Sequence, residues 1–239
     1  MTLAILQARM SSSRLPGKVL ADLAGAPMIL RQIERLKRAR SLDRIVVATS
    51  HESSDDTLAQ VLDQAGIALH RGDLNDVLGR FGTALEAWGE TGDVVRLTAD
   101  CPLADPDVID ATIALHQTRG ADYTSNVAEP RTFPKGLDVE VMTTRALRVA
   151  LAEAVDAHDR EHVTPFLYRH PDRFRLAAHS QSRDEGDVRW TVDRPDDLEF
   201  VRAVYEALYS HNAGFSSEDV RSFVRTRPDL ALLGEDRRI

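Results

Sequence analysis

The chain has 239 residues, a length that suits one large α/β domain with a substantial core better than two independent domains. Its 43% hydrophobic and 28% charged residues are typical of a soluble globular protein. The formal net charge of −8 argues against a general nucleic-acid binder, because such proteins usually present a basic face.

The cysteine and histidine content limits the cellular compartments and the kinds of metal site that fit this sequence. The single cysteine, Cys101, rules out an intrachain disulfide framework and is compatible with a reducing compartment. The chain opens with no signal-peptide pattern and has no apolar run of about 18 residues, so we expect a cytoplasmic protein without a membrane partner. The eight histidines are scattered without zinc-type spacing, so we expect any metal to be bound by carboxylates, which suits magnesium.

The first predicted strand, residues 3–6, leads into a basic loop with the sequence ARMSSSRLPGK, residues 8–18. Three fixed positive charges, three serines and a glycine suit the phosphates of a nucleoside triphosphate, although an ordinary basic surface turn can look the same. Neither a P-loop nor a GxGxxG motif occurs. The loop precedes a helix predicted at residues 27–39, which is where open α/β sheets place their ligand crevice. The candidate nucleotide contacts here are Leu6, Ala8, Arg9, Ser11, Ser12, Ser13, Arg14 and Lys18.

The following elements alternate between strands and helices. Strands are predicted at residues 45–48, 67–69 and 94–97, and helices at residues 54–65, 74–88 and 107–118. This alternation indicates a parallel, doubly wound sheet with helices on both faces. Residues 1–120 are therefore expected to form a Rossmann-like, nucleotide-binding half.

Further polar side chains follow these strands. Thr49 and Ser50 end the second strand and could offer hydroxyl or backbone groups to a base edge. Arg71 ends the third strand and could reach the base or the triphosphate. Arg80 belongs to the same charged set, although Asp76 and Arg80 lie four residues apart on a predicted helix and could simply pair on its surface.

Two aspartates are candidate metal ligands. Asp100 follows the strand at residues 94–97, at the carboxyl end where ligands bind, and could coordinate magnesium that bridges triphosphate oxygens; alternatively it is a turn residue. Asp193 occupies a second strand-to-helix junction, whereas Asp196 and Asp197 are explained as first-turn helix acids. Convergence of Asp100 and Asp193 on one ion requires the strand near residue 190 to lie beside the strand near residue 96.

The second half has a different pattern. Strands are predicted at residues 120–126, 137–144, 174–180 and 187–192, with a turn at residues 183–186 between the last two, and helices at residues 144–155, 160–170, 195–208 and from Ser216 onward. Charged and polar residues cluster between the two candidate metal ligands, so an acceptor pocket is expected there. Solvated strand carboxylates and a structural histidine are the alternative interpretation. The candidate acceptor contacts are Asn126, Lys135, Asp138, Glu140, Glu161, His162 and Thr164.

Eight segments occur together in one order, namely ILQARMSSSRLPGK, VVATS, RGDLNDVLGRF, RLTADCPLADP, DYTSN, FPKGLDVEV, REHVTPFLY and TVDRPDDL. They resemble the SpsF-like, spore-coat polysaccharide branch of the cytidylyltransferases, which is similar to the acylneuraminate and 3-deoxy-manno-octulosonate cytidylyltransferases. The resemblance spans residues 3 to about 200. It implies a Rossmann-like, three-layer nucleotidyltransferase fold of the α/β class with a mostly parallel mixed sheet.

The resemblance also implies roles for particular residues. Arg9, Arg14 and Lys18 would hold the phosphates of CTP, and Asp100 and Asp193 would bind magnesium. It further implies a homodimer to which the second half contributes. We therefore expect one domain, residues 1–239, comprising a nucleotide-binding half at residues 1–120, an acceptor-binding and dimerisation half at residues 121–210, and a C-terminal helix and tail at residues 211–239.

The predicted function is a magnesium-dependent cytidylyltransferase of surface polysaccharide biosynthesis. An anionic acceptor oxygen, of a sugar acid such as a nonulosonate or octulosonate, would attack the α-phosphorus of CTP and expel pyrophosphate to give a CMP-sugar. Arg14, Lys18 and Asp100 are the predicted catalytic residues. Three alternatives stay open from the sequence: a phosphosugar or phosphonate acceptor, a glycosyltransferase that consumes a nucleotide sugar, and a nucleotide-binding module without turnover.

Overall fold

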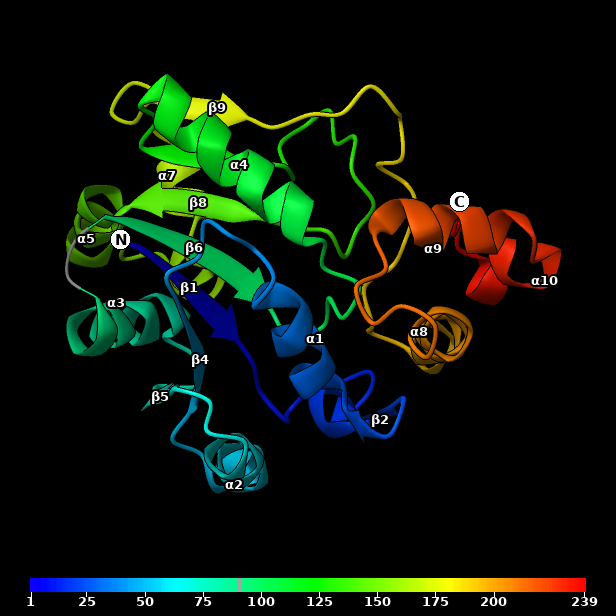
Figure 1. Ribbon diagram of the computed structural model, residues 1–239. Helices are drawn as coiled ribbons and strands as arrows, with labels where there is room; N and C mark the ends of the chain where they lie inside the picture. Colours follow the sequence, from blue (N-terminus) through cyan, green and yellow to red (C-terminus); the bar gives the residue numbers. More distant parts are fainter. Residues whose placement is uncertain (90–91) are drawn as a thin grey trace.

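A mixed sheet forms the centre of the molecule (Figure 1). The computed structural model describes residues 1–89 and 92–239, and in this part of the chain seven strands pair in the order β5-β4-β1-β6-β8-β7-β9. These strands are β1 (Thr2–Gln7), β4 (Arg44–Ser50), β5 (Leu69–Gly72), β6 (Asp93–Thr98), β7 (Tyr123–Ser125), β8 (Glu140–Thr143) and β9 (Leu176–Ala178). Only β8 runs against its described neighbours, since β6 and β7 both pair with it antiparallel while the other pairings are parallel. The mostly parallel mixed sheet predicted from the sequence is confirmed.

Helices cover both faces of the sheet and continue into a group beside it (Figure 1). They are α1 (Met28–Leu36), α2 (Asp56–Gln64), α3 (Val77–Trp88), α4 (Pro106–Arg119), α5 (Thr144–Glu153), α6 (Ala157–His162), α7 (Pro165–Tyr168), α8 (Pro195–Leu208), α9 (Ser217–Arg225) and α10 (Pro228–Ala231). Short pieces complete the order: 3-10 turns η1 (Lys18–Leu20), η2 (Ser53–Asp55) and η3 (Leu233–Glu235), and a hairpin of β2 (Asp22–Leu23) and β3 (Ala26–Pro27). None of the described helices combines the length and apolarity that a membrane span needs.

Alternation along the central strand β1 builds two cores. Leu3 and Ile5 point to one face and pack with residues of α3, α5 and α7. Ala4 and Leu6 point to the other face and pack with residues of α1, α2 and α4. Because both faces are covered, residues 3–6 of the strand are all apolar rather than alternating with polar residues, as expected for a parallel strand inside a three-layer fold.

A third core lies beside the sheet, under α8 and α9. Val188, Trp190 and Val192 are fully buried in it. The Trp190 indole donates to the Arg238 carbonyl oxygen at 2.8 Å, which ties the C-terminal segment to this core. The core brings residues from the two ends of the chain together, since Leu23 and Met28 also belong to it.

Helix boundaries follow the capping signals in the sequence. The Asp105 carboxylate caps α4 by accepting from the Asp107 amide, Pro106 is the first helical residue, and Gly120 ends the helix in the left-handed conformation. Thr143 is the N-cap of α5. The two helices, predicted from the sequence at residues 107–118 and 144–155, are confirmed.

Two predictions for the second half are wrong. Residues 187–192 do not form a hairpin with residues 174–180, because β9 pairs in parallel with β7 and the 187–192 segment has only an isolated bridge, between Lys135 and Arg189. Its apolar alternation reflects packing under α8 instead of strand pairing. The helix predicted at residues 160–170 is broken into α6 and α7 at Val163, whose φ of +72° no α-helix accommodates.

Replacement of Gly136 by alanine is expected to disturb the contact between the connection before β8 and the third core. Gly136 has φ +112°, and a Cβ atom there would lie 2.6 Å from the Thr191 nitrogen. Backbone strain costs about 1–3 kcal/mol, and overpacking costs about as much. A loss of about 3 kcal/mol in the free energy of unfolding lowers Tm by roughly 6–12 °C in a chain of this size. Gly25→Ala is the control, because Gly25 has φ +78° but no atom within 4 Å of its Cβ position. Differential scanning calorimetry showing equal losses for the two variants would contradict the packing argument.

Candidate active site

The basic loop between β1 and η1 is anchored from below by a buried carboxylate. Asp55 accepts the Met10 amide at 2.7 Å, the Thr49 hydroxyl at 2.9 Å and the Ser50 amide at 3.0 Å. Burial alone would raise the pKa of Asp55, but the hydrogen bonds from Met10, Ser50 and Thr49 outweigh it and hold that pKa below its usual value. Thr49 and Ser50 are fully buried, so these two predicted nucleotide contacts instead fix the root of the loop.

The loop then folds back on itself. The Met10 carbonyl oxygen accepts the amides of both Ser12 and Gly17 at 2.9 Å. Gly17 has φ +72°, a left-handed conformation in which a side chain is strained, and it directly precedes η1. This reversal turns the first residue of η1, Lys18, back toward the carboxyl ends of the strands.

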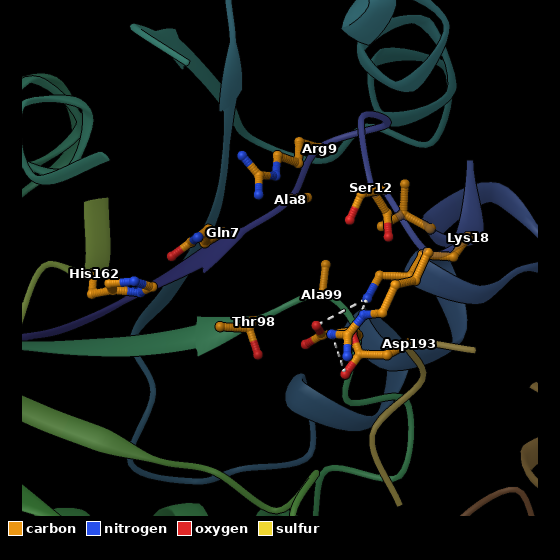
Figure 2. A pocket seen from close by; sticks show the side chains of 13 residues that line it. Gln7, Ala8, Arg9, Ser12, Lys18, Thr98, Ala99, His162 and Asp193 are labelled. Atoms are coloured by element: carbon orange, nitrogen blue, oxygen red, sulfur yellow. Dashed lines mark hydrogen bonds and ion pairs between the residues drawn. The ribbon is translucent and has the colours of Figure 1, made fainter. Parts of the chain in front are cut away.

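The Lys18 ammonium lies between the two predicted metal ligands (Figure 2). Its Nζ donates to Asp100 Oδ2 at 3.1 Å, to Asp193 Oδ1 at 2.9 Å and to the Val192 carbonyl oxygen at 2.6 Å. Only 9% of the Lys18 side chain is exposed. The structure therefore brings Asp100 and Asp193 together, as the sequence predicts, and places Lys18 between them, which the sequence did not predict.

Asp193 is brought to this place by the segment from the third core. The Val192 amide donates to the Asp100 carbonyl oxygen at 2.8 Å, so the segment lies beside residue 100, just past β6, and is not a further strand of the sheet. The two carboxylates lie close together although the segment before Asp193 does not pair with β6 as a strand, the arrangement that the sequence prediction required.

Three cations surround the Asp193 carboxylate. Besides Lys18, Arg14 lies 3.0 Å and Arg189 lies 2.8 Å from Asp193 Oδ2. Half-burial would raise the pKa of Asp193, but Lys18 and Arg189 bind the charged form and, with the charge of Arg14, hold that pKa below its usual value. Arg189 is itself held by Asp197, because its Nε and Nη2 each donate to an Asp197 carboxylate oxygen at 3.0 Å.

A polar cavity of about 340 Å³ opens above this cluster. The loop contributes cations and hydroxyls, the ends of β1 and β6 form the floor, and His162 closes the side away from Lys18 (Figure 2). The lining residues are Gln7, Ala8, Arg9, Ser12, Ser13, Arg14, Lys18, Val19, Thr98, Ala99, Asp100, His162 and Asp193.

A buried charge network supports the floor. Arg96 of β6 forms an ion pair with Glu140 of β8, and Arg96 also donates to Gln7 Oε1 at 3.3 Å. The Glu140 carboxylate further accepts the hydroxyls of Tyr123 and Thr164, the latter at 2.6 Å. Glu140 and Thr164 are buried and do not line the cavity, so they support the site from beneath rather than meeting a ligand in this conformation.

His162 lies next to the strained residue Val163, at the junction of α6 and α7. Its ring packs against that of His158 in a tilted arrangement, with an interplanar angle of 56° and centroids 4.3 Å apart. Burial and the nearby His158 charge lower the pKa of His162, so its imidazole is neutral at pH 7. Of the seven predicted acceptor contacts, it alone lines the cavity.

The remaining predicted contacts lie elsewhere in the described chain. Leu6 is core and Ser11 is exposed outside the cavity lining. Arg71 bonds to the carbonyl oxygens of Ser50 and Glu52 and pairs with Asp56. Arg80 is buried and donates to the Asp73 carbonyl oxygen, and Asn126 is hydrogen-bonded to the backbone of Leu137 and Val139. Asp138 pairs with Arg131, and Lys135 and Glu161 are exposed.

Burial lowers the pKa of Arg80 to about 10, so Arg80 is still charged at neutral pH. Arg71 and Arg80 border a separate hollow of about 460 Å³ together with His51 and His70. The two arginines thus lie on a second concave surface, at the β4–β5 edge of the sheet, and do not line the cavity that holds Lys18.

Cys101, next to Asp100, is a buried thiol. Burial, reinforced by the neighbouring Asp100 charge, raises its pKa well above the usual value. The thiol is therefore protonated at neutral pH and packs in the core. Because only a thiolate is strongly nucleophilic, this protonated thiol is a poor nucleophile.

Sequence reasoning missed several residues of the site. Gln7 and Thr98 line the floor, and each is the last residue of an otherwise mostly apolar strand. That signal was available, because a polar residue at the carboxyl end of a parallel strand faces the ligand crevice. Arg189 was also missed, although its spacing of four residues to Asp193 and of eight to Asp197 puts three charges in one short stretch.

The paired carboxylates fit a magnesium ion. Both reach the same ammonium group within 3.1 Å, so the two side chains are close enough to share one small cation, and their oxygens are the ligands that magnesium prefers. No cluster of three or more His, Cys, Asp or Glu side chains suited to a metal occurs among residues 1–89 and 92–239. Magnesium commonly uses one or two carboxylates and completes its shell with water and substrate phosphates, so a pair is sufficient.

Comparison with known proteins agrees with this arrangement. The cytidylyltransferase family model matches residues 3–220. The spore coat polysaccharide biosynthesis protein SpsF of Bacillus subtilis is 31% identical over 235 residues, 95% of each chain. A 3-deoxy-manno-octulosonate cytidylyltransferase of Anaeromyxobacter sp. (strain K) is 41% identical over 111 residues, which cover 46% of this chain and 44% of that enzyme.

A solved structure of a cytidylyltransferase from Leptospira borgpetersenii superimposes with a TM-score of 0.89 at 27% identity, covering 96% of this chain and 95% of that one. Given the family match over most of its length, the chain belongs to the cytidylyltransferase family and is a nucleotidyltransferase.

Proposed function

We propose that this enzyme transfers the cytidylyl group of CTP to an anionic sugar acceptor, with magnesium, and releases pyrophosphate. The hydroxyl oxygen of the acceptor forms a bond to the α-phosphorus and loses its proton to solvent, the bond from the α-phosphorus to the bridging oxygen breaks, and pyrophosphate leaves with that electron pair. The observation that carries the proposal is the convergence of Lys18, Asp100 and Asp193 in one polar cavity. This set supplies both a cation for phosphate oxygens and carboxylates for a metal.

The loop residues are suited to bind and polarise the triphosphate. Arg9, Arg14 and Lys18 carry fixed positive charge on the cavity wall, and Ser12 and Ser13 add hydroxyl donors. Negative charge grows on the leaving pyrophosphate during transfer, so cations placed beforehand stabilise the transition state more than the ground state. No covalent intermediate with the protein is needed.

Asp100 and Asp193 would hold the magnesium ion. When bound there, magnesium supplies charge neutralisation to the triphosphate oxygens. Asp197 and Arg189 fix the position of Asp193, since Arg189 bridges the two carboxylates. Asp193 is therefore held in place by groups other than the metal.

The acceptor is proposed to be a sugar acid, in surface polysaccharide biosynthesis. Support comes from two names among the relatives, a spore coat polysaccharide biosynthesis protein and a 3-deoxy-manno-octulosonate cytidylyltransferase. His162 lines the cavity on the side away from Lys18, which leaves room for an acceptor between them (Figure 2). A phosphosugar or phosphonate is the second candidate, because the cations of the cavity suit any anionic acceptor. The homodimer and the cytoplasmic location remain predictions.

The test of the proposed function is pyrophosphate release in the presence of magnesium. CTP, UTP, GTP and ATP are each combined with sugar acids, phosphosugars and phosphonates. We expect release with CTP and a sugar acid only. Release with CTP and a phosphosugar or phosphonate would move the acceptor to the second class, and release with another nucleotide in preference to CTP would overturn cytidylyl transfer by this chain.

Asp100→Asn should reduce kcat for pyrophosphate release by about 10²- to 10³-fold, the scale that removal of one charged transition-state contact produces. The substitution keeps the shape of the side chain and removes the negative charge that faces Lys18. Asp63→Asn is the matched control, because Asp63 is exposed on α2 and does not line the cavity. Near-normal turnover of the Asp100 variant would remove Asp100 from the mechanism.

His162→Ala should raise KM for the acceptor by about tenfold, the size of one lost hydrogen bond to a charged group, while KM for CTP stays within twofold. The neutral imidazole of His162 offers one N–H on the acceptor side of the cavity. His211→Ala, on the exposed end of the chain segment after α8, is the control. Initial-rate kinetics in which KM for CTP rises instead would assign His162 to the nucleotide.

A further inference from the structure

The ammonium group of Lys18 lies where the two carboxylates of the metal pair meet. We propose that Lys18 keeps divalent cations out of the Asp100–Asp193 site until a nucleoside triphosphate binds, so that metal and nucleotide enter together. The inference rests on the proposed magnesium-dependent function and adds the order in which the site is filled. It concerns a second role of Lys18, as an occupant of the metal site.

The contacts of Lys18 leave little access for another cation. All three contacts that its Nζ makes are to oxygens, of Asp100, Asp193 and the Val192 carbonyl, at 2.6 to 3.1 Å. With 9% of the side chain exposed, the ammonium is largely dehydrated and is satisfied by these partners. A metal ion that bound both carboxylates would have to displace Lys18 and leave its charge without a partner, which is costly in a partly buried site.

The surrounding charges act in the same direction. Arg14 and Arg189 contact Asp193 Oδ2, so three positive charges face the two carboxylates. Arg189 also pairs with Asp197, so the charges of the cluster are already matched, and a divalent cation approaching the two carboxylates meets cations that are in contact with them. In a partly buried site, unit charges a few ångströms apart interact much more strongly than in bulk water.

A triphosphate changes this balance. The same cavity is lined by Arg9, Ser12 and Ser13, so phosphate oxygens can bind beside Lys18. These oxygens give the ammonium of Lys18 and the guanidinium of Arg14 new anionic partners, and the carboxylates are then free to accept the metal. Because the two ligands favour the same displacement of Lys18, each should increase the affinity for the other.

Binding of Mn²⁺ to the nucleotide-free protein tests the inference. Mn²⁺ has the oxygen preference of Mg²⁺ and its free concentration is measured by electron paramagnetic resonance. We expect weak binding to the wild type and at least tenfold tighter binding to Lys18→Met, with Lys18→Gln as a second variant that also removes the charge. The gain should vanish in the double variant Lys18→Met with Asp193→Asn. Thermal unfolding of each variant checks that the fold is retained.

Two controls separate charge removal at the site from charge removal in general. Lys37→Met removes an exposed lysine after α1 and should bind Mn²⁺ as the wild type does, as should Lys18→Arg, which keeps the charge. If the wild type binds Mn²⁺ as tightly as Lys18→Met, or if neither folded Lys18 variant gains affinity, the inference is overturned. Pyrophosphate release by the wild type in EDTA would instead overturn the proposed magnesium-dependent function, so the two failures are distinguishable.

Discussion

Asp193 reaches the edge of the sheet only because the extended segment before it is held by backbone hydrogen bonds on two sides. The Trp190 amide donates to the Lys135 carbonyl oxygen at 2.7 Å, and the Val192 amide donates to the Asp100 carbonyl oxygen at 2.8 Å. The third core holds the apolar side of this segment in place. The position of the second carboxylate, the ion pairs around it and the shape of the cavity all depend on this docking. Packing remote from the cavity therefore sets the distance between the carboxylates of Asp100 and Asp193.

The charged groups of the site are organised in pairs even without a ligand. Lys18 and Arg189 neutralise Asp193, Asp197 neutralises Arg189, and Arg238 contacts Asp197 at 2.9 Å with both side chains fully buried. Such a chain of alternating charges satisfies each group that loses water on folding. It also means that any anion entering the cavity meets cations that already have partners, so its binding exchanges one set of ion pairs for another.

Much of the fold and the centre of the site could be predicted from the sequence, because their signals are local. Apolar runs that alternate with helical patterns predicted the sheet and α4. The basic loop pointed to Lys18, and the position just after a predicted strand pointed to Asp100. The errors concern residues whose role depends on a distant partner. Thr49 contacts Asp55 because η2 places that carboxylate beneath the loop. The apolar alternation of residues 187–192 fits a strand of the sheet as well as it fits an extended segment under α8. His162 lines the cavity because the chain reverses at Val163, which has a positive φ. Valine rarely adopts this conformation, so the sequence does not predict the reversal.

The direction of β8 has a consequence for how such a site can diversify. Because β8 runs against its neighbours, Glu140 begins it at the carboxyl edge of the sheet, and the chain returns to the same edge at Thr164 after α5 and α6. The hydrogen bond between Glu140 and Thr164 closes this excursion at its base. Residues 141–163 thus form an excursion that leaves this edge through β8, crosses the core in α5 and returns to the edge, where its last turn of helix supplies His162. Insertions or substitutions within it could reshape one wall of the cavity during evolution while the basic loop and the paired aspartates stay unchanged.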